Sequence, residues 1–334
     1  MAELLQRIKN KTAYSYLDDS QRIDVLYVAG QPATLSFESG AVIKSSCINC
    51  FEESCLKIKV GENVWDDLRM SQTDVLCPTD AVFKDDDGNV SIDSDKCIGC
   101  GLCIAVCPVG AIHFNNQSKA VIHRDLSNLK RTDTPVVLNS LNISHSNQPI
   151  IESEPLIRGV LVNINMLDSR TATINRLVCK ALQVTGIDTF LTRQGDVNMR
   201  MDGISAYGDF HILVEVETVA NLDSPRDILD DVAVFCSRNN VDKSKVKGMI
   251  VLPELPNKRT EFWELISDIK NVVDLDIMIV PLTALLSVAW NKTAMDVLLF
   301  NLSKDNTSAR EGITILLGRE PNLASPCNLV EAAK

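Results

Sequence analysis

The cysteines constrain this chain more than any other feature, because eight of its eleven fall between positions 47 and 107. Four of them form the run Cys97, Cys100, Cys103 and Cys107, and Pro108 follows the last. In this spacing, CxxCxxCxxxCP, three thiolates close on one inorganic cluster, while the fourth starts a short helix and points to another cluster. The run therefore predicts a partner set of cysteines elsewhere in the chain.

The partner set lies upstream, and its last cysteine is again followed by proline. The segment CPTDAVF of this set resembles CPVGAIHF of the other, which indicates an internal duplication. Roughly residues 44 to 124 resemble the bacterial-type ferredoxins that hold two [4Fe-4S] clusters. That resemblance implies one cluster on Cys47, Cys50, Cys55 and Cys107, and another on Cys77, Cys97, Cys100 and Cys103.

The first half of the duplication departs from the ferredoxin spacing at two points. Four residues rather than two separate Cys50 from Cys55, and a 21-residue insertion precedes Cys77. We therefore expect the first cluster to be labile or to be tuned to a different potential. Trp65 and Leu68 of the insertion either shield that cluster from water or serve only local packing.

Zinc sites and disulfides are the alternative uses of closely spaced cysteines. A zinc ribbon needs two knuckles of two ligands, whereas these cysteines come in triplets followed by Cys-Pro. The first residues, MAELLQRIKNK, lack the long apolar run of a secretory signal, and disulfides are rare in proteins that are not exported. We therefore expect iron-sulfur ligands in a cytoplasmic protein. Cys179, Cys236 and Cys327 are expected to be packing residues.

The net charge and the hydropathy pattern of the chain limit the kinds of partner that it can have. The formal net charge of −11 disfavours a protein that coats nucleic acid by bulk electrostatics. It leaves open a local basic groove around Lys243, Lys245 and Lys247, although such runs are commonly solvated loops. The longest apolar stretch, Ile277–Trp290, contains Pro281 and is shorter than the roughly 20 residues of a spanning helix, so no membrane is expected.

Four parts are predicted along the chain. Residues 1–45 form a strand cap, in which Arg22–Val28 and Ala33–Phe37 pair and Ala41–Lys44 runs on to the first ligands. Residues 46–125 form an α+β ferredoxin-like domain. Residues 126–156 are polar and read as a linker. Residues 157–334 alternate between strand and helix patterns, which predicts an α/β domain with a mixed sheet.

The α/β domain is expected to open with a strand, Leu156–Ile164, and a helix that ends at Gly186. A hairpin of Asn198–Ser205 and His211–Thr218 follows, and then a helix capped by Ser224. The remaining predicted elements are the strand Gly248–Leu252, the helix Glu261–Val272, the strand Leu275–Val280, the helix Leu282–Leu302 and the strand Ile313–Leu317.

Acidic side chains gather on one face of the hairpin. A reversal around Tyr207 and Gly208 sets Asp202 opposite Leu213, so Glu215 and Glu217 project on the same side as Asp202. Three carboxylates on one face are the hard oxygen ligands that Mg²⁺ prefers. The alternative is that these residues form the solvated side of a half-buried strand.

The order of helix, acidic hairpin, helix and strand resembles the restriction-endonuclease-like, or PD-(D/E)xK, superfamily. The resemblance implies that Asp202 and Glu215 are metal ligands and catalytic residues, with Mg²⁺ as cofactor and DNA as partner. Glu217, also a candidate catalytic residue, stands where the superfamily usually has lysine, so Lys243 or Lys245 would have to substitute. His211 is either a supporting group or a surface residue.

Three functions follow. The first is a metal-dependent nuclease or DNA-processing subunit with a ferredoxin accessory domain. The second is an electron-transfer subunit whose α/β domain docks a protein redox partner. The third is a non-catalytic adaptor that keeps a nuclease-like fold.

Overall fold

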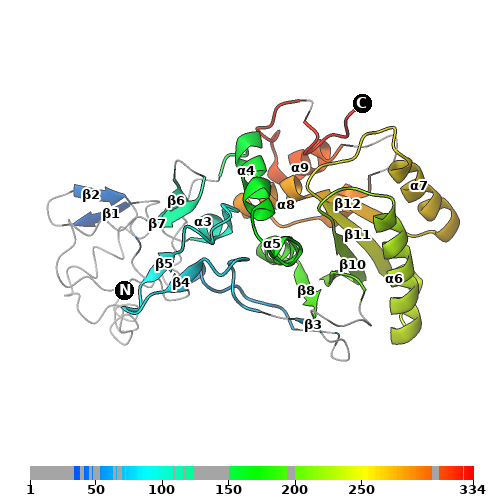
Figure 1. Ribbon diagram of the computed structural model, residues 1–334, viewed down its shortest axis with the longest axis horizontal. Coiled ribbons are helices and arrows are strands. Elements are labelled where there is room, and N and C mark those ends of the chain that lie inside the picture. Colours follow the sequence, from blue (N-terminus) through cyan, green and yellow to red (C-terminus); the bar gives the residue numbers. More distant parts are fainter. Residues whose placement is uncertain are drawn as a thin grey trace. The chain divides into compact units, whose positions relative to one another are not determined.

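The computed structural model describes residues 34–37, 41–44, 47, 53–62, 65, 70–71, 73–107, 110–115, 118–122, 150–193, 200–302, 308–325 and 327–334 (Figure 1). The chain divides into two compact units, one of residues 1–58 and 75–149 and one of residues 59–74 and 150–334. The insertion before Cys77 thus falls largely in the second unit, although the sequence placed it in the ferredoxin domain. Cys50, Leu68, Pro108 and the predicted strand Arg22–Val28 lie outside the described residues.

The first unit contains three two-stranded antiparallel pairs and one short helix, α3 (Leu102–Val106). Strand Thr34–Phe37 pairs with Ala41–Lys44, a partner that the sequence analysis did not assign to it. The pairs are β1–β2 (Thr34–Phe37, Ala41–Lys44), β4–β5 (Val82–Lys84, Val90–Ile92) and β6–β7 (Ile112–Phe114, Ala120–Ile122).

The β4–β5 and β6–β7 hairpins share several hydrogen bonds at positions thirty residues apart in the sequence. The carboxylate of Asp85 accepts from the backbone N–H of Asn89 at 2.8 Å, and the amide oxygen of Asn115 accepts from Lys119 at 2.9 Å. Each hairpin follows a Cys-Pro pair in the sequence. The repeated contacts agree with the internal duplication that the sequence predicted.

The second unit is built on a six-stranded mixed sheet in the order β12-β11-β10-β9-β8-β3 (Figure 1). β3, β8, β9 and β10 pair antiparallel with their neighbours, and β10, β11 and β12 run parallel to one another. The strands are β3 (Met70–Ser71), β8 (Asp188–Thr192), β9 (Gly203–Tyr207), β10 (Phe210–Val216), β11 (Val246–Leu252) and β12 (Ile277–Pro281). The hairpin predicted over 198–218 is therefore present, and β8 was not foreseen.

Helices cover both faces of this sheet. The main helices are α5 (Arg170–Val184), α6 (Asp223–Asn239), α7 (Glu261–Val273) and α8 (Leu282–Trp290). Helix α6 packs on β10, β11 and α7, whereas α5 packs on β8, β10 and α8. Ile212 and Leu213 of β10 are both fully buried, although successive strand residues point to opposite faces. The sheet is therefore the centre of the core of this unit.

Two predicted strands are helices. Residues 156–164 lie in α4 (Glu154–Asn165), which begins where the hydroxyl oxygen of Ser153 accepts from the backbone N–H of Leu156 at 3.3 Å. Residues 313–317 lie in α9 (Arg310–Leu317). Both predictions are wrong because a short apolar run fits a strand and a buried helix face equally well.

Two helix boundaries also differ from the prediction. Helix α8 ends at Trp290 and is followed by the 3₁₀ helix η4 (Val297–Phe300), so no single helix spans 282–302. Helix α6 is capped by Asn221, whose amide oxygen accepts from the backbone N–H groups of Asp223 and Ser224, and not by Ser224. A second 3₁₀ helix, η3 (Lys243–Lys245), precedes β11.

Residues 59–74, the docked segment, join the second unit through three kinds of contact. Strand β3 pairs antiparallel with β8 at the edge of the sheet. Trp65 is 8% exposed, contacts Phe190 and His211 edge-on with ring centroids 5.7 Å apart, and donates from Nε1 to His211 Nδ1 at 3.2 Å. The buried Lys180 ammonium donates to the backbone carbonyl of Thr73. Trp65 is thus a packing residue of the second unit, which agrees with the second of the two alternatives expected for it.

Within the part of the chain that the structure describes, every helix is too short or too polar to cross a membrane. The cytoplasmic location expected from the sequence is not tested by this finding and stays a prediction.

Replacing Trp65 should release the docked segment. We expect Trp65→Ala to destabilise the second unit by about 3 kcal/mol, because it removes a large buried ring, and Trp65→Phe by about 1 kcal/mol, because it removes mainly the bond to His211. Amide hydrogen exchange read by mass spectrometry should show faster exchange in β8. Val272→Ala, at a residue 84% exposed, is the control. Unchanged exchange in Trp65→Ala would contradict the docking.

Candidate functional site

The second cysteine group, Cys77, Cys97, Cys100 and Cys103, lies buried around the turn before α3. Burial raises the pKa of the Cys100 thiol, and the nearby Cys77 and Cys97 thiols raise it further. Burial also raises the pKa of Cys103 well above its usual value, with added effects of the other three thiols. Each thiol is therefore within electrostatic reach of the others, as ligands of one cluster must be.

Two glycines shape the turn that carries these thiols. Gly99 and Gly101 have φ angles of 72° and 74°, a left-handed conformation that strains any residue with a Cβ. The turn lets the chain present Cys97, Cys100 and Cys103 inward over seven residues. The CxxCxxC spacing requires such a tight reversal, which is why this part of the site could be predicted from local sequence.

The first cysteine group is Cys47, Cys50, Cys55 and Cys107, of which Cys50 lies outside the described residues. Burial raises the pKa of the Cys55 thiol to about 12, and the next contributions come from Cys107 and then Cys47. Cys107 follows α3 directly, so the helix carries the end of the second run to the first group. The nearness of Cys107 to Cys55 agrees with the reciprocal pairing that the ferredoxin resemblance implies, and the ligand sets stay a prediction.

Backbone amides point at one sulfur of each group. The backbone N–H of Ala81 donates to Cys77 Sγ at 3.2 Å, and that of Ala111 donates to Cys107 Sγ at 3.3 Å. The two bonds are related by the same thirty-residue repeat as the hairpins. Hydrogen bonds to cysteine sulfur stabilise the negative charge of a ligated thiolate and tune the potential of a cluster.

The donor sets fit clusters better than single metal ions. Across the described ranges, no group of three or more His, Cys, Asp or Glu side chains is placed to hold one ion. A zinc ion needs all its thiolates at about 2.3 Å from one point. A [4Fe-4S] cube instead offers separate iron corners, one for each thiolate. The triplet spacing of the cysteines and the backbone amides on two of their sulfurs agree with the second requirement.

The acidic hairpin differs in register from the prediction. Tyr207 pairs with Phe210 and Gly203 with Val214, so the turn is Gly208-Asp209 alone and Asp202 falls opposite Glu215 rather than Leu213. A shift of two residues preserves the faces of a strand, so Asp202 and Glu215 do share a side. The Asp202 carboxylate accepts from Asn175 Nδ2 at 2.6 Å and from the backbone N–H of Val216 at 2.9 Å.

The third carboxyl of this cluster is Asp231 of α6, which is 3% exposed and hydrogen-bonds with Glu215. Glu217 instead lies beside Ser224 at the start of α6. We call Asp202, Glu215 and Asp231 the carboxyl trio. Burial raises the pKa of Glu215 to about 10, and the Asp202 charge adds to this effect. Glu215 therefore keeps its proton at neutral pH and bridges the two aspartates.

The solvated-strand alternative does not fit β10, because Leu213 on the face of Glu215 is fully buried and Asp202 and Glu215 are only partly exposed. Asp231 and Asn175 were missed by sequence reasoning. The signal for Asp231 was its place in α6 three residues after Ile228 and next to Val232, on a stripe that is otherwise apolar.

Lys245, one of the two lysines expected to serve this hairpin, lies within electrostatic reach of His211, and Lys243 and the nearby Lys247 bind other groups. The Lys243 ammonium donates to the backbone carbonyl of Val273, and Lys247 pairs with Asp276 at 2.6 Å. His211 packs between Trp65 and Phe235, and burial lowers the pKa of its imidazole. The described part of the chain thus gives no support for Mg²⁺, and the roles of Asp202, Glu215 and Glu217 in catalysis stay predictions.

Replacing Glu215 by glutamine, which has a similar shape and no charge, tests whether the folded protein holds a proton on Glu215. An unfolded glutamate releases its proton near pH 4.5, whereas folded Glu215 holds it to about pH 10. Wild-type stability should therefore fall between these values as the pH rises, by up to about 1.4 kcal/mol per pH unit, and Glu215→Gln should escape this loss. Denaturant unfolding from pH 5 to 8 measures it, with the exposed Glu261→Gln as control. Identical pH profiles for wild type and Glu215→Gln would contradict the assignment.

Comparison with known proteins supports the interpretation of the cysteines as iron-sulfur ligands. Residues 90–113 match the 4Fe-4S binding domain family. The chain is 27% identical over 97 residues to the thiosulfate reductase electron transfer subunit PhsB of Salmonella typhi, which covers 29% of this chain and 41% of the relative. It is 32% identical over 87 residues to a polypeptide of the polysulfide reductase of Wolinella succinogenes, covering 26% and 35%.

A selenate reductase subunit of Mesobacillus selenatarsenatis is 55% identical over 40 residues, covering 12% of this chain and 14% of the relative. The chain therefore spans less than half the length of each of these relatives. No solved structure matches it. The restriction-endonuclease-like fold, nuclease activity and DNA binding receive no support from these comparisons. The chain carries a 4Fe-4S binding domain at residues 90–113 and is an iron-sulfur protein.

Proposed function

We propose that this chain is an electron-transfer protein, in which two [4Fe-4S] clusters relay electrons and the α/β unit docks a protein redox partner. The observation that carries the proposal is that thiols of the two cysteine groups lie near one another. The Cys103 thiol of the second group is within electrostatic reach of Cys55 of the first. One cluster would be enough to stabilise a small fold, whereas two neighbouring clusters form a path for electrons.

The proposed ligands are Cys47, Cys50, Cys55 and Cys107 for the first cluster and Cys77, Cys97, Cys100 and Cys103 for the second. Each bound cluster supplies one-electron reduction and reoxidation. The chain sets the conditions for that chemistry. The backbone amides of Ala81 and Ala111 stabilise negative charge on the cysteine sulfurs that they contact. Burial of the second cysteine group keeps water away from its sulfurs.

The proposed partner is a catalytic subunit of a reductase. Support comes from the names of the relatives, one an electron transfer subunit and the others components of reductases. The net charge of −11 suits docking to a basic surface, because opposite potentials steer protein encounters. The α/β unit is the part of the chain that these partial matches leave unexplained, and we assign the docking role to it.

A non-catalytic nuclease-like adaptor is the second candidate. The observation that favours it is the order of α5, the β9–β10 hairpin, α6 and β11, with Asp202 and Glu215 side by side, which matches the resemblance apart from β8 between α5 and the hairpin. Against catalysis, a proton bridges Glu215 and its neighbours, and Asp202 is fully engaged by Asn175 and a backbone amide.

Substituting one cysteine ligand at a time should distinguish the two clusters. We expect Cys103→Ser and Cys107→Ser each to lower iron from about eight to about four atoms per chain, and to remove different EPR signals from the dithionite-reduced protein. Cys236→Ser, outside both groups, is the matched control and should change neither. Loss of the same signal in both variants would contradict the reciprocal pairing. Failure of a low-potential viologen to reduce the loaded wild type would contradict electron transfer.

Nuclease activity should be absent. Protein purified anaerobically with its clusters intact should cleave duplex, single-stranded and modified DNA no faster in Mg²⁺ or Mn²⁺ than the Asp202→Ala, Glu215→Ala double variant, because the carboxyl trio is engaged internally. Gel analysis of end-labelled DNA measures this. Metal-dependent cleavage by the wild type that the double variant lacks would overturn both candidate functions and establish a nuclease.

A further inference from the structure

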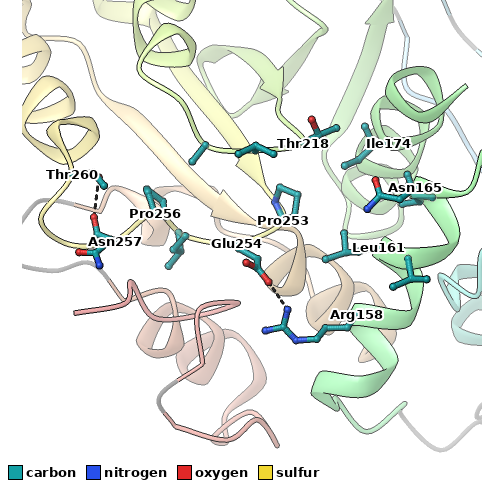
Figure 2. A pocket seen from close by; sticks show the side chains of 15 residues that line it. Arg158, Leu161, Asn165, Ile174, Thr218, Pro253, Glu254, Pro256, Asn257 and Thr260 are labelled. Atoms are coloured by element: carbon teal, nitrogen blue, oxygen red, sulfur yellow. Dashed lines mark hydrogen bonds and ion pairs between the residues drawn. The ribbon is translucent and has the colours of Figure 1, made fainter.

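A pocket of about 570 Å³ opens in the second unit beyond the carboxyl ends of β10 and β11 (Figure 2). Residues 218–220 follow β10 and residues 253–257 follow β11, and α4 and α5 supply the opposite wall. Ligands of α/β sheets bind preferentially at this edge, and small-molecule sites have volumes of about 300–1,000 Å³. Neither proposed function uses the pocket.

The β11 side of the pocket is held in place by the C-terminal segment. The backbone N–H of Leu255 donates to the carbonyl of Asn328 at 2.8 Å, and that of Lys258 donates to Ala333 at 2.9 Å. Pro253 and Pro256 further restrict the backbone of the same loop. A loop fixed at both ends keeps the hollow open without a ligand, so little ordering is needed on binding.

The charged groups at the pocket neutralise each other. The Arg158 guanidinium donates from Nη1 to Glu254 (Figure 2). It also donates from Nε to Glu154 at 2.8 Å and from Nη2 to Asn328 at 2.8 Å. The second oxygen of Glu254 accepts from Asn328 Nδ2 at 2.7 Å. Each nitrogen of the guanidinium and each oxygen of Glu254 thus has a protein partner. The pocket offers no unpaired charge to a ligand.

The remaining lining is apolar with two neutral polar groups. Val162 and Val219 are 51% and 71% exposed, so their apolar surface is open to a ligand. The Asn165 amide and the Thr218 hydroxyl also line the pocket, and within the described part of the chain no hydrogen bond engages either side chain. Both can donate and accept.

We propose that this pocket binds an uncharged, largely apolar small molecule that carries a hydrogen-bonding group. An ionised ligand would lose its hydration without gaining an opposite charge, because Arg158 and Glu254 already satisfy each other. A purely apolar ligand would leave the amide of Asn165 and the hydroxyl of Thr218 covered without partners.

Two probes that share one ring system test the charge. N-phenyl-1-naphthylamine is uncharged and has one N–H donor, and 1-anilinonaphthalene-8-sulfonate adds a sulfonate to the same rings. Equilibrium dialysis against full-length, cluster-loaded protein, read from the free probe, should show one site for the neutral probe. Its affinity should exceed that of the sulfonate by about tenfold or more. Equal or tighter binding of the sulfonate would overturn the proposal.

Substitutions locate the site. Val219→Trp should fill the pocket and weaken the neutral probe about tenfold or more, whereas Val272→Trp, at an equally open valine on α7, should not. Thr218→Val keeps the shape and should weaken binding about fivefold by removing the hydroxyl. Circular dichroism checks that each variant folds. Binding that is insensitive to both Val219→Trp and Thr218→Val would place the probe elsewhere and refute the assignment.

Discussion

The crowding of buried thiols into two groups is the constraint on which the first unit depends. Thiolates so close together repel one another away from water, and their raised pKa values show that the chain alone favours neutral thiols. Among the described elements of this unit, the strands are three or four residues long and α3 has five, so these elements bury only a small core between them. Cluster binding, which stabilises the deprotonated ligands, must therefore supply much of its folding free energy.

What the sequence could predict was local. The cysteine spacing and the Cys-Pro repeats indicated the grouping of thiols that the structure shows, because ligand geometry is set within a few residues. Predicting the register of the hairpin also required the length of its turn, which the residue pattern alone does not determine. The strand assigned to 156–164 failed although Ser153 and Pro155, a cap and a first-turn proline, mark a helix start. Strand β3 had no local signal, because two residues become a strand only beside β8.

The carboxyl trio places three acidic side chains beside one another with at most partial exposure to water. Two aspartates and a glutamate would repel one another if all were ionised, but a proton held on Glu215 leaves the cluster with hydrogen bonds in place of repulsion. Asn175 and the Val216 amide serve the remaining oxygens of Asp202. Acidic residues on one strand face thus suggested a metal site because residue type was visible in the sequence and burial was not.

The docked segment leaves the first unit after Cys55 and returns to it before Cys77. The two chain ends at this point, which we call the neck, are joined by the Lys57–Val75 bridge and by the hydrogen bond from the Leu76 N–H to the Leu56 carbonyl. Each side of the neck thus leads into a different cysteine group, and the polypeptide passes between the units three times. During synthesis this segment leaves the ribosome more than a hundred residues before its partner strand β8 exists. The sheet edge therefore closes late, and neither unit can be excised by cutting a single peptide bond.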